Sequence, residues 1–275
     1  MTEQNKNIEK LIYTAEDVKR YLAENLPVEV DVQREVTSTN TILKSLAEQG
    51  VPEGFVLIAQ AQTAGKGRLG RSFHSPIGTG LYFSILLRPT CSAERSLFIT
   101  TAAAVAVCQA MESLTDKKPL IKWVNDIYLD EKKICGILTE ASINYETKGL
   151  NWAVLGIGIN LAEPEGGFPE DIRNIAGSLF SAPCPKDVAA QLAAEVINRF
   201  FALYKDVESG AFIDEYRGRS FLTGREIVFS RGNETFNGVV TGISDEAHLL
   251  VRLDSGEEQA FSAGEVQIHK GFQKL

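Results

Sequence analysis

Three basic side chains lie close together in a glycine-rich segment of the chain. Lys66, Arg68 and Arg71 fall within residues 60–84, which also contain five glycines and a proline. Apolar runs flank this segment on both sides, so we expect a loop held between two buried strands. Cations on such a backbone can clamp an anionic group. Taken alone, the composition fits a phosphate clamp and a solvated basic loop equally well.

The same loop matches two known phosphate-binding motifs only in part. Residues 65–70 read G-K-G-R-L-G, which satisfies the dinucleotide fingerprint G-x-G-x-x-G. That fingerprint must open a helix, whereas Pro76 and Gly78 follow shortly, so we exclude a dinucleotide-binding fold. A Walker A loop would need glycine in place of Gln60 and Ser or Thr in place of Gly67, and it is excluded as well.

A short polar run precedes the expected helix over residues 41–50. It reads Ser38-Thr39-Asn40. Taken alone, the simpler interpretation is that these residues cap the helix. The alternative is that their hydroxyls and amide bind a polar group of a ligand.

Two more polar segments follow apolar runs. Asn125-Asp126 have Lys122 nearby and a lysine pair across an expected hairpin turn over residues 130–133, so they could hold Mg²⁺ and phosphate. The structural alternative is an Asx turn. Gly156, Gly158 and Asn160 close another apolar run, where the alternative is a β-bulge. Together with Gly136 these glycines would let a ligand approach the backbone.

Composition narrows the class of protein. The 275 residues carry a net charge of −8 and a pI near 5.1, which argues against a general nucleic-acid binder. The four cysteines and three histidines match no zinc spacing. The N-terminus lacks a secretory signal, and the most apolar segment is shorter than the roughly 20 residues of a membrane span. We therefore expect a cytoplasmic protein with no membrane association.

The elements that must position these residues alternate between helices and strands. Hydrophobic periodicity predicts helices over residues 14–26, 41–50, 92–114, 187–207 and 210–220. It predicts strands over 28–36, 55–59, 81–87, 120–123, 126–129, 134–141 and 151–161, the last two paired with each other. From about residue 222, five short strands separated by turn signals predict a small β-barrel.

No single motif is decisive, but their order is. S-T-N, Q-x-x-G-K-G-R-x-G-R, K-W-x-N-D-I-Y, K-x-x-G-I-L and G-I-G-I-N occur in succession, and in this order and spacing they resemble the biotin protein ligase family. The resemblance covers about residues 36–270, and G-K-G-R-L-G-R and K-W-V-N-D-I-Y-L are its most specific parts. It implies an α+β fold, a mixed sheet with flanking helices of the biotin/lipoate ligase type, followed by an SH3-like β-barrel. We expect an N-terminal helical extension over residues 1–30, a catalytic domain over 31–221 and the barrel over 222–275.

The resemblance also implies site residues. Biotin would be bound by Ser38, Thr39, Asn40, Gln62, Gly65, Lys66, Gly67, Arg68, Lys133, Gly136, Gly156 and Gly158. ATP would be bound by Arg68, Arg71, Phe73, Asn125 and Asn160, and Mg²⁺ would lie near Asp126 and Asn160. Lys133, Arg68 and Arg71 would carry the catalysis. Two positions depart from the family pattern, because Phe73 stands where tryptophan is common and Lys66 where arginine is frequent.

The implied activity is ATP-dependent ligation. Biotin would be activated as biotinyl-5′-AMP and transferred to a lysine of the biotin carrier domain of a carboxylase or decarboxylase. Because only about 35 residues precede the segment that resembles the family, we expect a short form without an N-terminal DNA-binding domain, and a homodimer is possible. The alternatives are a lipoate or octanoate ligase or transferase, a biotin-responsive repressor, and a module that merely sequesters an anion.

Overall fold

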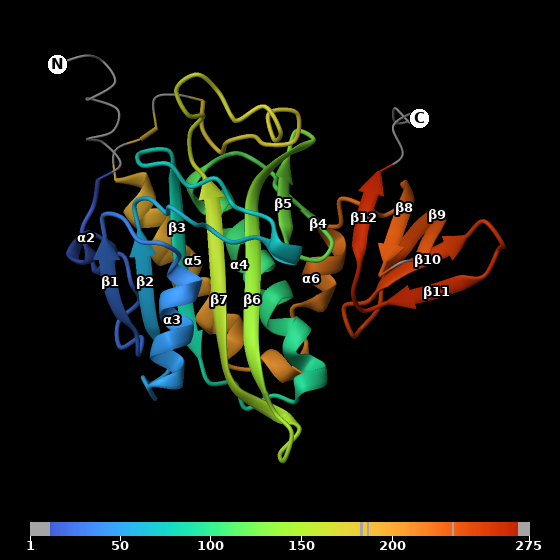
Figure 1. The fold of residues 1–275 in the computed structure, drawn as a ribbon, viewed down its shortest axis with the longest axis horizontal. Coiled ribbons are helices and arrows are strands. Elements are labelled where there is room, and N and C mark those ends of the chain that lie inside the picture. The colour runs from blue at the N-terminus through green and yellow to red at the C-terminus, as the bar shows by residue number, and fades with distance from the viewer. Residues whose placement is uncertain (1–11, 182–183, 186, 233, 269–275) are drawn as a thin grey trace.

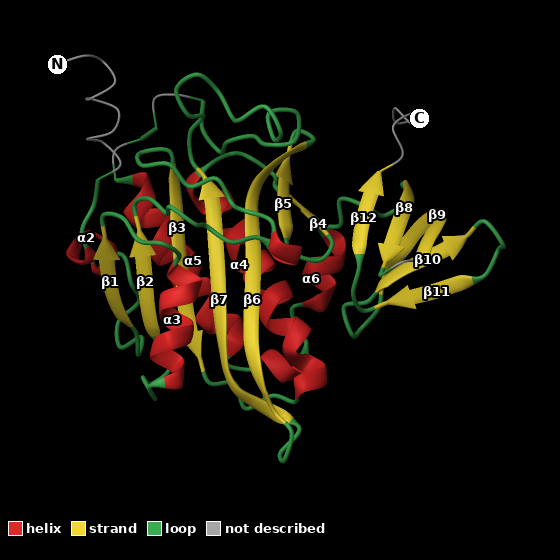
Figure 2. Cartoon of the chain, viewed as in Figure 1, coloured by secondary structure: helices red, strands yellow, loops and turns green. Residues whose placement is uncertain are grey.

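Seven strands form one mixed sheet, and five more form a smaller antiparallel sheet near the C-terminus (Figures 1 and 2). The computed structural model describes residues 12–181, 184–185, 187–232 and 234–268. The expected fold class, a mixed sheet with helices followed by a small β domain, is confirmed. Residues 1–11 of the expected N-terminal extension lie outside the described part of the chain.

The large sheet has the strand order β1-β2-β3-β7-β6-β5-β4. Only the β1–β2 pair is parallel, and the other neighbours are antiparallel. Its strands are β1 (Glu29–Gln33), β2 (Phe55–Ala59), β3 (Gly80–Leu87), β4 (Leu120–Lys122), β5 (Asp126–Leu129), β6 (Lys132–Asn144) and β7 (Gly149–Asn160). The sequence-predicted pairing of the two long runs is therefore correct, because they form β6 and β7.

Helices cover the two faces of this sheet unequally. Two long helices, α4 (Leu97–Leu114) and α5 (Val188–Tyr204), pack behind it, and α3 (Thr39–Glu48) lies on the opposite face (Figure 1). The shorter helices are α2 (Ala15–Lys19) and α6 (Ile213–Gly218), with 3₁₀ turns η1 (Arg68–Gly70), η2 (Ala93–Ser96) and η3 (Val207–Ser209). The face that α3 leaves open is where the glycine-rich loop crosses β7 and β6 (Figure 1).

The alternation of side chains along each strand separates the core from the open face. On β3, Leu81, Phe83 and Ile85 are fully buried in the main hydrophobic cluster together with residues of α4 and α5. Ser84 and Gly156 belong to the opposite face. The expectation that the most apolar segment is too short for a membrane span is wrong, because residues 93–114, which include α4, are long and apolar enough by length and composition only. Of their most apolar window, however, 72% is buried inside the protein. This helix is a core element of the fold.

The sequence-predicted helix over residues 14–26 is too long. Thr14 and Asp17 form the expected capping box, but α2 ends at Lys19. Asn198 of α5 accepts a hydrogen bond from the Ala23 amide at 2.8 Å and donates one to the Tyr21 carbonyl at 2.9 Å. These tertiary contacts take up backbone groups that a longer helix would have used for itself.

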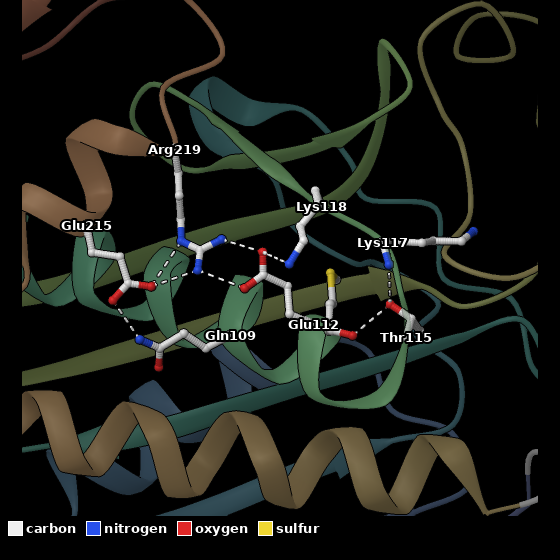
Figure 3. A network of polar contacts seen from close by, with 8 residues as sticks. Gln109, Glu112, Thr115, Lys117, Lys118, Glu215 and Arg219 are labelled. Carbon is white, nitrogen blue, oxygen red and sulfur yellow. Dashed lines mark hydrogen bonds and ion pairs between the residues drawn. The ribbon is translucent and has the colours of Figure 1, made fainter.

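A network of charged side chains supports the β4 edge of the sheet (Figure 3). The guanidinium of Arg219 contacts both carboxylate oxygens of Glu112 on α4, each at 2.9 Å, and that of Glu215 on α6 at 2.7 Å. The Arg219 carbonyl in turn accepts a hydrogen bond from the Ile121 amide at 2.8 Å. Strand β4 is thus tied to two helices.

The small sheet has the order β11-β10-β9-β8-β12. Its strands are β8 (Glu226–Arg231), β9 (Glu234–Ile243), β10 (Leu249–Leu253), β11 (Glu258–Phe261) and β12 (Glu265–Ile268). They correspond to the five strands predicted from the sequence. The rings of Phe229 and Phe261 pack in its core, tilted by 35° with their centroids 4.0 Å apart, and the centroid of the Trp123 ring lies 6.3 Å from that of Phe229. Because the Trp123 indole also donates to the Ala247 carbonyl at 2.8 Å, the segment between β4 and β5 is anchored to the barrel.

Candidate active site

A cavity of about 1090 Å³ lies on the open face of the large sheet. Its walls come from the α3 N-terminus, the glycine-rich loop, strands β4 to β7, residues 168–176 and the turn before β12. The sequence-predicted site residues all line it, namely Ser38, Thr39, Asn40, Gln62, Gly65, Lys66, Gly67, Arg68, Arg71, Phe73, Asn125, Asp126, Lys133, Gly136, Gly156, Gly158 and Asn160. The structure brings these segments together, and their individual ligand roles stay predictions.

Two rows of paired residues form the floor of this cavity. In the first row, Gly156 of β7 pairs with Ser84 on one side and with Leu138 on the other. In the second row, Gly158 pairs with Gly136, which pairs with Asp126, which pairs with Lys122. The rows are two residues apart along the strands, or about 7 Å. The register through Gly156, Gly158 and Asn160 is continuous, so the β-bulge considered for this motif is absent.

The neutral end of the cavity is defined by Ser38, Thr39, Asn40, Gln62 and Ser84, and hydrogen bonds connect the last four of these residues. Ser84 is fully buried, and its hydroxyl lies 2.7 Å from the Thr39 hydroxyl and 2.6 Å from Asn40 Oδ1. Thr39 donates through its amide to Gln62 Oε1 at 3.0 Å. A Cβ at Gly156 would lie 2.1 Å from Asn40 Oδ1, so only glycine leaves room for this amide. The polar run is therefore built into the floor of the cavity.

The capping interpretation of this run is wrong. Ser38 is the N-cap residue of α3, but its side chain makes no capping hydrogen bond. Its hydroxyl is not hydrogen-bonded to any residue that the structure describes, although the residue is only 2% exposed. A hydroxyl on a cavity wall with no partner among the described residues is suited to bind a ligand.

Glu140 on β6 fixes the orientation of Asn40. The Asn40 amide nitrogen donates to Glu140 Oε2 at 3.0 Å, and the Lys44 ammonium donates to Glu140 Oε1 at 2.8 Å. Burial raises the pKa of Glu140, but the hydrogen bonds from Lys44 and Asn40 outweigh it and lower the pKa overall. The carboxylate therefore stays ionised and keeps Asn40 Oδ1 turned toward Ser84.

Gln62 links the neutral end to the glycine-rich loop. Its amide nitrogen donates to the Ser75 hydroxyl at 3.1 Å, and that hydroxyl donates to the Phe73 carbonyl at 2.9 Å. A Cβ at Gly65 would lie 2.5 Å from the same carbonyl. The two ends of the loop are thereby held close together.

The charged end of the cavity, defined by Arg68, Arg71, Lys122, Asp126 and Lys133, has most of its cations in internal pairs. Lys133 contacts Asp126 at 2.7 Å, and Arg71 forms an ion pair with Glu265 at the start of β12. Arg68 donates to Asn125 Oδ1 at 2.9 Å and to the Gly264 carbonyl at 3.2 Å. The loop therefore bridges the large sheet and the barrel.

Phe73 occupies the middle of the floor, between the two ends. A Cβ at Gly158 would lie 2.6 Å from its ring, and one at Gly136 would lie 3.2 Å from it. The glycines thus let an aromatic ring rest on the backbone, whereas the sequence predicted that they admit a ligand. The Lys133 ammonium lies beside the ring, 3.3 Å from the position of the same Gly136 Cβ.

The lysine pair is placed differently from the predicted four-residue hairpin turn. Only Asp130 and Glu131 form the turn, both with positive φ, and Lys132 and Lys133 begin β6. The Lys132 ammonium donates to the Asn174 carbonyl at 2.8 Å, away from the cavity lining. Asn125 is no Asx turn either, because its Oδ1 accepts from Arg68 at 2.9 Å and its amide nitrogen donates to the Ile137 carbonyl at 2.8 Å.

Asp126 is suited to Mg²⁺ that arrives with a nucleotide. Its Oδ1 is buried and, apart from the Lys133 ammonium, has no hydrogen-bond partner among the described residues. Mg²⁺ bound to substrate phosphates usually takes one or two protein carboxylates. The described part of the chain contains no group of three His, Cys, Asp or Glu that could hold a metal alone. Asn160, the other predicted metal neighbour, donates to the Gly177 carbonyl at 2.9 Å.

Sequence reasoning missed several residues of the site. Ser84, Ser75 and Glu140 have no signal of their own, because each is a single polar residue in an apolar strand or a loop. Glu265 and Gly264 were missed because they belong to the barrel, almost 200 residues from the loop that they contact. Only alternation along the strand, which places Ser84 on the same face as Gly156, could have pointed to one of them.

Comparison with protein families gives two matches. Residues 32–160 match the biotin/lipoate A/B protein ligase family, and residues 222–268 match the biotin protein ligase C-terminal domain. The first match contains all the predicted site residues. The second covers the five strands of the small sheet.

Individual relatives agree with these matches. The chain is 33% identical over 231 residues to the bifunctional ligase/repressor BirA of Bacillus spizizenii, covering 83% of this chain and 70% of that protein. It is 29% identical over 248 residues to the biotin–[acetyl-CoA-carboxylase] ligase of Mycobacterium tuberculosis, covering 86% and 88%. The biotin protein ligase of Aquifex aeolicus, solved with biotin and ATP, superposes with a TM-score of 0.73 at 27% identity, covering 88% and 99%.

Proposed function

The chain belongs to the biotin protein ligase family, and from this premise we propose that it joins biotin to the AMP moiety of ATP, releasing pyrophosphate, and then transfers biotin to a lysine of a carrier domain. Membership makes the chain an enzyme, a biotin–protein ligase. The intermediate, the acceptor and the role of each residue are proposals. The observation that carries them is one cavity with a neutral and a charged end on a common floor of glycines.

The neutral end is suited to the bicyclic ring of biotin. A ureido group has one carbonyl acceptor and two N–H donors, and it needs matching partners when it leaves water. We place it against Ser38, Thr39, Asn40 and Gln62, with Gly156 as the floor. The Ser38 hydroxyl has no protein partner among the described residues, so it is free to bond to the ring.

The charged end is suited to the first chemical step. A carboxylate oxygen of biotin attacks the α-phosphorus of ATP, the bond to the β-phosphate oxygen breaks, and pyrophosphate leaves with its electron pair. Lys133 would hold the biotin carboxylate beside the α-phosphate, and Arg68 and Arg71 would bind the phosphates. Removing a charge that stabilises such a transition state typically costs about 10²–10³ in rate.

Ligand binding would exchange the internal pairs for pairs with phosphate. Lys133 would leave Asp126, which would then be free for the Mg²⁺ that accompanies ATP. Asn125 and Asn160 would bind the nucleotide, and the base would stack on Phe73. Lys66 is exposed and has a point charge where the family often has the planar guanidinium of arginine. We therefore propose that Gly65, Lys66 and Gly67 bind biotin mainly through their backbone.

The second step needs no covalent enzyme intermediate. The amine of an acceptor lysine attacks the acyl carbon of biotinyl-5′-AMP, an amide bond forms, and AMP leaves with the electrons of the anhydride bond. Until then the loop must keep water from the anhydride. Burial raises the pKa of the thiols of Cys91, Cys135 and Cys184, so these cysteines are poor nucleophiles, as this scheme allows.

We propose the biotin carrier domain of a carboxylase or decarboxylase as the acceptor, and the cytoplasm as the site of the reaction. The repressor activity named for BirA is not part of the proposal, and neither is binding to DNA. A homodimer is compatible with the exposed edge of β1.

The experiment is incubation of the full chain with MgATP, biotin and a biotin carrier domain. We expect the mass of the carrier domain to rise by one biotinyl group on its acceptor lysine, and lipoate in place of biotin to give no product. A carrier domain modified by lipoate and not by biotin would contradict the proposal in favour of a lipoate ligase. An unmodified carrier domain with either acid would reject both.

A further inference from the structure

Lys122 occupies the far end of the second row of the cavity floor. It is the last residue of β4 and pairs directly with Asp126 of β5. Directly paired residues in antiparallel strands point to the same face, so the Lys122 and Asp126 side chains lie side by side above the sheet. Lys122 also lines the cavity, and its side chain is half-buried.

The other half-buried cations of the cavity already have partners. Lys133 is paired with Asp126, and Arg68 is hydrogen-bonded to Asn125 and Gly264. Arg71 is more exposed and is paired with Glu265. Lys122 forms no ion pair or hydrogen bond with any residue that the structure describes. It is thus a cation held inside the site with no anion of its own.

The surroundings of Lys122 make this arrangement costly without a ligand. Its ammonium lies 5.5 Å from the centre of the Tyr128 ring, a cation–π contact that offsets part of this cost. The cost itself comes from burial, which lowers the pKa of Lys122. Asp126 and Glu265 oppose this effect, whereas Lys133 and Arg71 add to it. A desolvated ammonium near two further cations gains strongly from a polyanion.

The position of Lys122 along the row indicates which part of the polyanion it would meet. From the middle of the floor outward, the row holds the Phe73 ring, the Lys133 ammonium, the Asp126 carboxylate and then Lys122. Neighbouring strands are about 4.8 Å apart, so β4 lies about 10 Å beyond β6. A triphosphate whose α-phosphate lies at Lys133 would therefore extend toward Lys122.

The edge strand that carries Lys122 is also fixed in place. Arg219 is bonded to Glu112 of α4 and Glu215 of α6 (Figure 3), and its carbonyl accepts a hydrogen bond from the Ile121 amide. The Trp123 indole is bonded to the barrel. Both neighbours of Lys122 in the chain are thus anchored to different elements. The lysine is presented by a rigid support.

We propose that Lys122 binds the β- and γ-phosphates of ATP and holds the pyrophosphate that leaves. This inference deepens the proposed function and rests on it. Lys133 would serve the end of the triphosphate where the bond forms, and Lys122 the end that departs. Asp126 between them would be left to hold the Mg²⁺ that accompanies ATP.

The test is biotin-dependent exchange of labelled pyrophosphate into ATP by the full chain. Lys122→Met removes the charge and keeps the apolar stem over Tyr128. We expect the KM for pyrophosphate to rise about tenfold to a hundredfold, the usual effect of losing a hydrogen bond to a charged group. The KM for biotin should stay within about twofold of wild type. Lys122→Arg keeps the charge and should restore most of the pyrophosphate affinity.

The matched control is Lys118→Gln, which removes the same charge from an 82% exposed side chain just before β4. It should exchange like wild type. A Lys122→Met protein with unchanged pyrophosphate KM would overturn the inference. So would Lys122→Met and Lys122→Gln variants that melt earlier but keep wild-type pyrophosphate affinity, because Lys122 would then only cover Tyr128. If wild type shows no biotin-dependent exchange at all, the proposed function itself fails.

Discussion

At the neutral end of the cavity the polar side chains are bonded to one another, whereas at the charged end the cations are held by partners that a ligand can replace. Thr39, Asn40 and Ser84 are at most 4% exposed and form a fixed set of donors and acceptors. Arg71 and Lys133 form ion pairs with the carboxylates of Glu265 and Asp126, respectively. The contrast follows from the ligands, because an uncharged ring needs preformed geometry and a polyanion needs available positive charge.

The largest effect should come from Lys133→Ala at the charged end. We expect the adenylation rate to fall about 10²–10³-fold, because the charge beside the reacting carboxylate and α-phosphate is lost. Biotin-dependent pyrophosphate release measures it. Lys132→Ala removes the neighbouring charge, which is bonded to a loop carbonyl outside the cavity, and should be close to wild type. Near-normal release by Lys133→Ala would remove its catalytic role.

Arg68→Ala should weaken the hold of the loop on the intermediate. Arg68 contacts Asn125 and the Gly264 carbonyl, so its loss removes one contact of the loop with the sheet and one with the barrel. We expect biotinyl-5′-AMP to escape and to label lysines of bystander proteins, detected by blotting with avidin. Arg68→Lys keeps the positive charge but loses the bidentate guanidinium, so it should release less biotinyl-5′-AMP than Arg68→Ala. If Arg68→Ala retains the intermediate like wild type, the loop is not a clamp.

At the neutral end Asn40→Ala should affect biotin and leave the chemistry intact. The change removes one hydrogen-bond partner from Ser84 and one from Glu140, so we expect the KM for biotin to rise about tenfold to a hundredfold. The maximal rate of adenylation should recover at saturating biotin. Asn144→Ala makes the same change on the β6–β7 hairpin and should have no effect. A fall in maximal rate without a change in KM would contradict the assignment.

The smallest effect should come from Glu265→Gln. Partly exposed ion pairs contribute only about 0–1 kcal/mol, so the barrel tolerates its loss. Arg71 would then be released for phosphate, and we expect the KM for ATP to fall about twofold to fivefold. Glu258→Gln on β11 is the control for loss of charge from the barrel. A rise in the KM for ATP would mean that Glu265 positions Arg71 and does not compete for it.

The sequence predicts the contiguous motifs of the cavity better than the isolated residues that contact them. Motifs that are contiguous in the chain, such as residues 38–40 and 65–71, identify most of the cavity wall, and strand alternation predicts the sheet around them. The partners of those motifs are isolated residues on distant elements. Ser84 belongs to an apolar strand, and Glu265 comes from a barrel turn, so only tertiary packing reveals them. The early end of α2 could not be predicted either, because it depends on hydrogen bonds with the distant residue Asn198.

The central claim is that the cavity separates recognition of biotin from the handling of phosphate. Pyrophosphate exchange by wild type, Asn40→Ala and Lys133→Ala, each titrated with biotin at fixed MgATP, tests this most directly. We predict that exchange by Asn40→Ala rises to the wild-type plateau at high biotin, and that Lys133→Ala stays about 10²-fold or more below it at every concentration. The account is contradicted if excess biotin rescues Lys133→Ala or if Asn40→Ala never reaches the wild-type plateau.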